Sequence, residues 1–126
     1  MLNASLLSII DEAGVAVLTL TEGLDKDEFL ASRLTCTETL HQVRIMGAST
    51  GNVPPQAQAL LPEVEWRGWH TVAQQLDESH ETQGEALWFA VRSLVPATLM
   101  WLRVYRQNQP QIFQWASAPV ANTAKS

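Results

Sequence analysis

Cysteine, basic residues and long apolar runs are all scarce in this chain of 126 residues. A single cysteine, Cys36, excludes an internal disulfide and offers no pair of thiolates to a metal ion. Only eight lysines and arginines stand against thirteen aspartates and glutamates, so the formal net charge is −5. An acidic surface repels phosphate at long range, which disfavours non-specific binding to nucleic acid.

The apolar runs are short for a membrane protein. The longest lie around Ala13–Leu20 and Leu94–Leu102, whereas a helix that spans a bilayer needs about 20 apolar residues. The first basic residue is Lys26, so no charged segment of the kind that opens a secretory signal precedes the early apolar residues. Together with the single cysteine, these features predict a cytoplasmic protein without membrane contact.

Strand alternation, internal repeats and glycine-rich phosphate loops are also missing, and apolar residues recur instead at helical spacing. The first predicted helix carries such a stripe from Leu6 to Leu20 and stops near Gly23. Leu7, Val15 and Leu18 form a second stripe, so we expect this helix to bury two faces. Further helices are predicted from Asp25 to Leu30, from Thr35 to the Gly47–Gly51 region, from Pro55 to Leu61, from Trp66 to about Glu78 and from Glu81 to Tyr105.

The fold class that follows is all-α, an up-and-down bundle of four long helices plus short ones. Apolar residues form 46% of the chain, enough for one core in a domain of this length. Pro96 lies inside the last helix and should kink it. The bundle is expected over residues 1–107 and a tail over 108–126, in which Ile112, Phe113 and Trp115 could dock on the body.

Four segments together resemble the HepT-like branch of the HEPN superfamily, in order and spacing over about residues 5–105. They are Thr21–Leu24 with Glu28–Leu30, Ile45–Gly47, Pro62–Arg67, and Leu87–Trp88 with Val91 and Pro96 beyond it. The resemblance implies a HEPN-like bundle that forms a homodimer, often encoded beside a minimal nucleotidyltransferase as a toxin–antitoxin pair. It also implies no cofactor and no metal, because active members are metal-independent endoribonucleases.

The ribonuclease motif of that family is an Arg, usually an Asn beside it, and a His four to six residues on. Counting forward from Trp66 places the Arg and Asn on Ala73 and Gln74 and the His on Glu78. Counting back from Trp88 places the His on Asp77 instead. A carboxylate at that position would repel the phosphate that the site must hold, so the motif is degraded. We therefore expect a catalytically silent association module.

The competing hypothesis is an endoribonuclease that cleaves RNA with a relocated set, Arg67, His70 and His80, in which a histidine would transfer the proton. An exposed histidine near a helix end is the more ordinary interpretation of His80. His70, Asp77 and Glu81 share one face if the helix is continuous, which would suit a divalent metal. A solvated acidic stretch explains them more simply, and we predict no metal site.

Three further residues are candidates for a partner or groove surface: Trp66, Trp69 and His41. Tryptophan is common at binding hot spots, although a packed core and dimer seam account for most buried indoles. Cys36 stands near a predicted helix start, where a thiol pKa can fall. Because the sequence offers it no convergent histidine and acid, we interpret it as a small buried hydrophobic residue.

Overall fold

The computed structural model describes residues 4–110, and within them every regular element is helical. The long helices are α1 (Ala4–Thr21), α3 (Arg33–Gly51) and the continuous run formed by α6 (His80–Phe89), a π-helical turn (Ala90–Leu94) and α7 (Val95–Asn108). The shorter ones are α2 (Lys26–Ala31), α4 (Pro55–Gln58) and α5 (Trp66–Gln75). The predicted all-α class is confirmed for this part of the chain.

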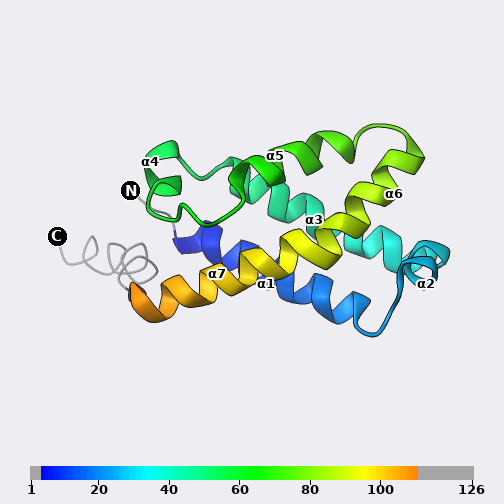
Figure 1. The fold of residues 1–126 in the computed structure, drawn as a ribbon, viewed down its shortest axis with the longest axis horizontal. Coiled ribbons are helices and arrows are strands. Elements are labelled where there is room, and N and C mark those ends of the chain that lie inside the picture. The colour runs from blue at the N-terminus through cyan, green and yellow to red at the C-terminus, as the bar shows by residue number, and fades with distance from the viewer. Residues whose placement is uncertain (1–3, 111–126) are drawn as a thin grey trace.

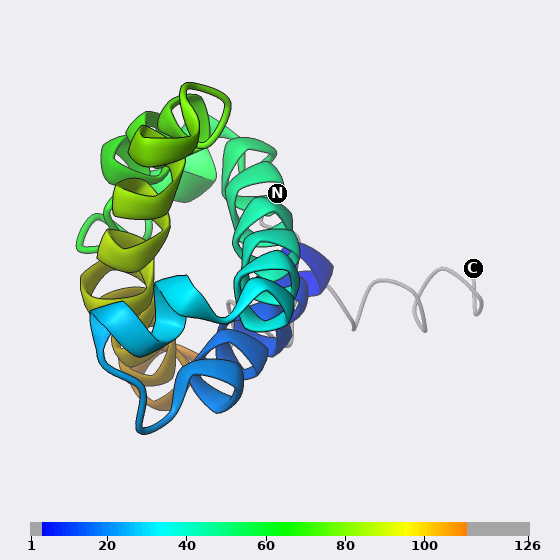
Figure 2. The same ribbon diagram turned by 90° about the vertical axis from the view of Figure 1, so that its right-hand side faces the viewer.

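The helices surround one core. α1 packs against α3 on one side and α7 on the other, and α5 closes the ring between α3 and α6 (Figures 1 and 2). The largest side chains in the core are fully buried: Trp69, Phe29, Leu7, Ile10, Met46, Leu61, Leu76 and Leu102. Burial of apolar surface on this scale, about 25 cal/mol for each Å², is the main stabilising term of the fold.

α1 and α7 approach each other closely because α1 carries a glycine at their crossing. A Cβ atom built on Gly14 would lie 2.6 Å from Leu99 Cδ2. After α1, Gly23 reverses the chain with φ of 77°, a left-handed conformation that glycine adopts without steric cost. The predicted end of the first helix is therefore confirmed.

The prediction that α1 buries a second face is wrong in part. Leu7 is buried, but Val15 is 52% and Leu18 is 38% exposed. Ile9 and Leu20 of the first stripe are exposed as well. Only one side of α1 meets α3 and α7, so a surface of apolar side chains remains in contact with solvent.

The helix starts follow local capping chemistry. Asp25 caps α2 with a complete capping box: Glu28 N–H donates to its carboxylate at 2.8 Å, and its own N–H donates to Glu28 Oε1 at 3.0 Å. The capping box predicted at Thr35 is wrong, because Ser32 caps α3 and accepts from Thr35 N–H. α3 therefore begins two residues earlier than its predicted start.

The helix changes type just before Pro96, where a kink was predicted. Proline cannot donate a backbone hydrogen bond to the preceding turn, and the five residues Ala90–Leu94 just before it form a π-helical turn. The helix continues across this turn to Asn108, slightly past the predicted bundle boundary at residue 107. The predicted docking of Ile112, Phe113 and Trp115 lies outside the described residues.

The run from His80 to Asn108 is long and apolar enough to cross a membrane, judged by length and composition. The mean hydropathy of its most apolar window is 1.2, and 44% of that window is buried inside the bundle. A core helix of a soluble protein meets the same criterion, so this single helix is a weak indication of a membrane span.

Candidate functional site

The positions that the HepT-like resemblance assigns to the ribonuclease motif lie along the last turns of α5 and just beyond it. Ala73 faces Gly47 of α3, and a Cβ atom built on Gly47 would lie 3.7 Å from the Ala73 Cβ. Gln74 and Glu78 are on the outer part of this segment, with Glu78 exposed. Asp77 follows the end of α5 and pairs with Arg44 of α3, Nη1 to Oδ1 at 2.9 Å.

The Arg44 guanidinium also donates to the Leu76 carbonyl oxygen at 3.2 Å. The Arg44 side chain therefore connects the end of α5 to α3, and its charge is matched by Asp77. A phosphate at this place would have to compete with that carboxylate for Arg44. The arrangement favours a structural ion pair over a site for an anion.

A cavity of about 540 Å³ opens between the end of α3, α4 and the first turns of α5. Arg67, His70 and Trp66 line it, and both Arg67 and His70 are exposed. The Trp66 indole donates to the Leu61 carbonyl at 3.0 Å, which fixes the ring at the wall of the cavity. Arg67 and His70 are thus brought together, and they could hold an anion at this surface.

His80 lies elsewhere. It begins α6 and lines a second cavity, of about 500 Å³, between α3 and α6. Arg67 and His70 do not line that cavity. The structure therefore brings Arg67 and His70 together and places His80 in a different cavity.

The continuous helix that would align His70, Asp77 and Glu81 does not form. α5 ends at Gln75, Asp77 lies in the following turn, and α6 begins at His80. No group of three or more His, Cys, Asp or Glu residues able to hold a metal ion occurs within residues 4–110.

Cys36 also lines the cavity between α3 and α6 and is partly buried. Its thiol donates to the Phe29 carbonyl oxygen, with Sγ at 3.1 Å. Burial raises the pKa of the Cys36 thiol above its ordinary value. The thiol is therefore protonated at neutral pH and is a poor nucleophile.

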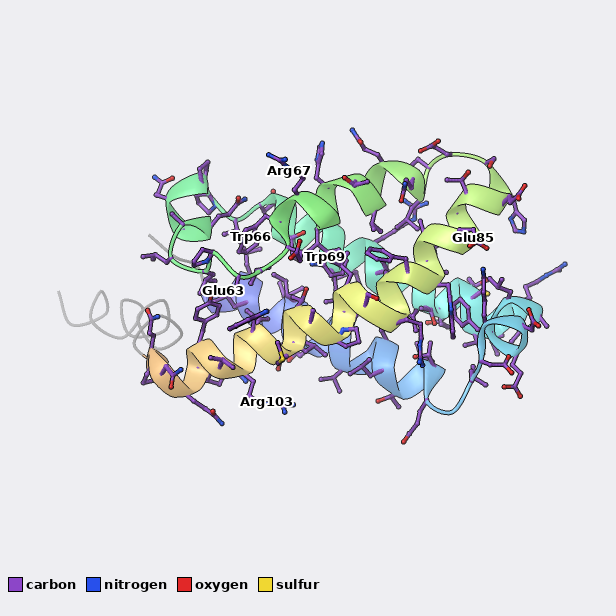
Figure 3. The ribbon with its side chains drawn as sticks, in the orientation of Figure 1. Glu63, Trp66, Arg67, Trp69, Glu85 and Arg103 are labelled. Carbon is purple, nitrogen blue, oxygen red and sulfur yellow. The ribbon has the colours of Figure 1, made fainter. Side chains whose placement is uncertain are left out.

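The three residues expected at a partner or groove surface separate from one another. Trp69 is 1% exposed and donates its indole N–H to Thr98 Oγ1 at 2.9 Å, so it belongs to the core and is closed to a partner. In Figure 3 Trp69 lies on α5 at the side that faces α7. Trp66 is half-buried at the cavity described above, and His41 is exposed on α3.

A surface that sequence reasoning missed lies between α1 and α7. It is a groove of about 640 Å³ in which Val15, Leu18 and Met100 are exposed, with charged residues at its walls. The lining residues are Asp11, Val15, Leu18, Thr19, Glu22, Pro96, Leu99, Met100, Arg103 and Arg106. The available signal was the second apolar stripe of the first helix, which we interpreted as a second buried face.

No protein-family model matches the chain, and no solved structure matches it.

Proposed function

We propose that the protein is a HepT-like bundle of the HEPN superfamily that has lost its ribonuclease site and works as a dimeric association module. The observation that carries the proposal is the set of large apolar side chains that remain exposed outside the core. They are Ile9, Val15, Leu18, Leu20, Leu30, Leu34, Leu60, Phe89 and Met100. Three of them, Val15, Leu18 and Met100, line one groove, and contiguous apolar surface is typical of sites for protein partners.

The loss of catalysis is supported by what occupies the motif positions. Ala73 and Gln74 carry no charge. Asp77 stands at a position where the motif has a histidine, and its carboxylate pairs with Arg44. General acid–base catalysis needs a titratable group within hydrogen-bond reach of the reacting proton. Ala73 and Gln74 have no titratable side chain, and the Asp77 carboxylate is already paired with Arg44.

The partners in this proposal are a second copy of the chain and a minimal nucleotidyltransferase protein, and the site of action is the cytoplasm. Mixing the purified chain with a purified minimal nucleotidyltransferase should give a complex that co-elutes in size-exclusion chromatography. Separate elution at high micromolar concentrations of both would remove the nucleotidyltransferase from the proposal and leave the homodimer.

Two measurements on the purified chain test the core of the proposal. The first incubates it in EDTA with a mixed pool of transfer and messenger RNA, which should remain intact. The second measures its mass in solution as concentration increases, and the mass should approach that of a dimer. RNA cleavage that co-elutes with the protein would contradict the loss of catalysis, and a monomer at every concentration would contradict the homodimer.

The second candidate function, an endoribonuclease with a relocated site, is favoured by one observation: Arg67 and His70 line the same cavity. If it is correct, His70→Ala and Arg67→Ala abolish RNA cleavage. His80→Ala distinguishes a site that needs His80 from a site formed by Arg67 and His70 alone, because His80 lines the other cavity. Cleavage that survives His70→Ala and Arg67→Ala would exclude a site built on these two residues, and cleavage that survives His80→Ala as well would contradict the whole relocated set.

A further inference from the structure

The groove between α1 and α7 has walls of opposite charge. Asp11 of α1 and Glu22, the residue after α1, belong to one wall, which we call the α1 wall, and Arg103 and Arg106 belong to the α7 wall. The exposed apolar residues Val15, Leu18 and Met100 line the same groove. The surface therefore has an apolar floor, an acidic side and a basic side.

α1 and α7 run antiparallel, and two contacts fix which residues are level with one another. Asp11 Oδ2 lies 3.8 Å from Arg106 Nη1, and Gly14 packs on Leu99. Residues later in α1 are therefore level with residues earlier in α7. Leu18, one turn beyond Gly14, is level with the region of Pro96, which lies one turn before Met100.

We propose that a second copy of this chain occupies the groove, related to the first by a two-fold axis that runs parallel to the two helices. This inference depends on the proposed homodimer and assigns its surface. In a two-fold interface the same patch meets itself. With the axis along the groove, the α1 wall of each copy lies against the α7 wall of the other.

That arrangement joins unlike charges and like apolar surfaces. Asp11 lies opposite Arg103 of the partner subunit, and the pair is formed twice. Val15 and Leu18 lie opposite the floor near Met100 of the partner subunit. The other two-fold arrangement, with its axis across the groove, would set the acidic α1 wall against itself and the basic α7 wall against itself. Like charges at such short range disfavour association.

The opposite side of the molecule does not take part in this dimer. Figure 3 shows Arg103 projecting from the edge formed by α7 and Arg67 projecting from the opposite edge, on α5. The degraded motif positions therefore remain outside the interface. Arg67 also supplies a control matched to Arg103, because Arg67→Glu and Arg103→Glu lower the net charge equally on opposite sides.

The test is sedimentation equilibrium of the full chain from about 1 µM to about 500 µM, a range that covers weak and moderate affinities. Asp11→Arg and Arg103→Glu should each raise the dissociation constant of the dimer by about tenfold or more, since each reversal turns two attractive pairs into two repulsive ones. Arg67→Glu should leave the constant unchanged. The variants are at exposed or half-exposed positions, and circular dichroism checks that each is folded.

Combining the reversals identifies the axis. In a mixture of the Asp11→Arg and Arg103→Glu chains, a heterodimer pairs unlike charges at both contacts. The arginine at position 11 of the first chain meets the glutamate at position 103 of the second, and Arg103 of the first chain meets Asp11 of the second. A heterodimer that is tighter than either homodimer should therefore form, and the chain that carries both substitutions should dimerise like wild type. If the two-fold axis lay across the groove, each wall would meet its own copy. A single reversal would then reduce the repulsion between two like-charged walls or leave it unchanged, so neither variant would weaken the dimer.

The possible results separate this inference from the proposed function. In one result, the wild-type chain forms a dimer whose dissociation constant stays the same or falls in both single variants. That result would overturn the α1–α7 pairing and leave the homodimer in place. A wild-type chain that remains monomeric at about 500 µM would overturn both. Weakening by each single reversal, together with recovery in the mixture and in the doubly substituted chain, is the result that supports the inference.

Discussion

Replacing Thr98 by valine removes one hydroxyl that connects α5 to the last helix. Thr98 is 1% exposed, its hydroxyl accepts a hydrogen bond from the Trp69 indole N–H at 2.9 Å, and it donates to the Leu94 carbonyl oxygen at 2.7 Å. Valine has nearly the shape of threonine, so the packing around position 98 changes little. Trp69, also 1% exposed, would keep its N–H in the core without an acceptor.

A buried donor that loses its partner costs about 1–3 kcal/mol. For a domain of this size, 1 kcal/mol corresponds to a change of about 3–6 °C in melting temperature. Urea denaturation followed by tryptophan fluorescence gives the free energy of unfolding directly. The midpoint should fall while the slope stays constant, because the substitution changes stability and leaves the exposed surface of the denatured chain the same.

Thr98→Ser is the matched control, because it keeps the hydroxyl and removes only a methyl group. Serine should cost about 1 kcal/mol and retain the hydrogen bond, so its loss should be smaller than that of valine. Equal stability of Thr98→Val and wild type would refute the argument that this hydrogen bond connects α5 to α7. So would a serine variant less stable than the valine variant.

Three further predictions concern single positions. Gly14→Ala should lower the free energy of unfolding by about 1–3 kcal/mol through its clash with Leu99, whereas Gly51→Ala, whose Cβ meets nothing within 4 Å, should not; chemical denaturation compares the two. Thr39→Val should keep or raise the melting temperature, because the buried Thr39 hydroxyl has no hydrogen-bond partner among the described residues, and a clear fall would contradict this. Cys36 should react with iodoacetamide more slowly than a free thiol at pH 7 and gain rate as the pH rises past the ordinary thiol range, because burial raises its pKa; labelling as fast as glutathione would contradict this.

Helix positions followed from periodicity because each helix buries a stripe against the same core. The starts of α2 and α5 and the end of α3 were predicted within a residue or two. The start of α3 was wrong because Ser32 and Thr35 both offer a hydroxyl at capping distance from a helix start. Sequence alone does not tell which hydroxyl faces the first free N–H groups, and the folded chain uses Ser32.

The apolar face of α1 shows a different limit. The spacing of Val15 and Leu18 is that of a helix face, and it predicts a face that excludes water. It does not specify whether the same chain or another chain covers that face. Within the described chain α3 and α7 cover the side that holds Ile10 and Val17, and Val15 and Leu18 remain exposed.

The hypothesis of a relocated site required Arg67 and His80 to lie close together, and the sequence alone does not determine that distance. A continuous helix would have kept the two segments in register. The chain instead turns after Gln75, and Ser79 caps a new helix by accepting from Thr82 N–H at 3.2 Å. That turn carries His80 away from Arg67 and His70 to the cavity beside Cys36.

Two sides of the molecule thus carry different kinds of chemistry. On the α3–α5 side, Asp77 pairs with Arg44 and balances its charge. On the α1–α7 side, the charges of the two walls are opposite in sign, with exposed apolar residues in the same groove. Asp11 and Arg106 already pair across the groove within one chain, and a uniformly charged ligand such as RNA would be repelled by one of the two walls. The proposed association between copies of the chain fits this charge pattern better than RNA cleavage does.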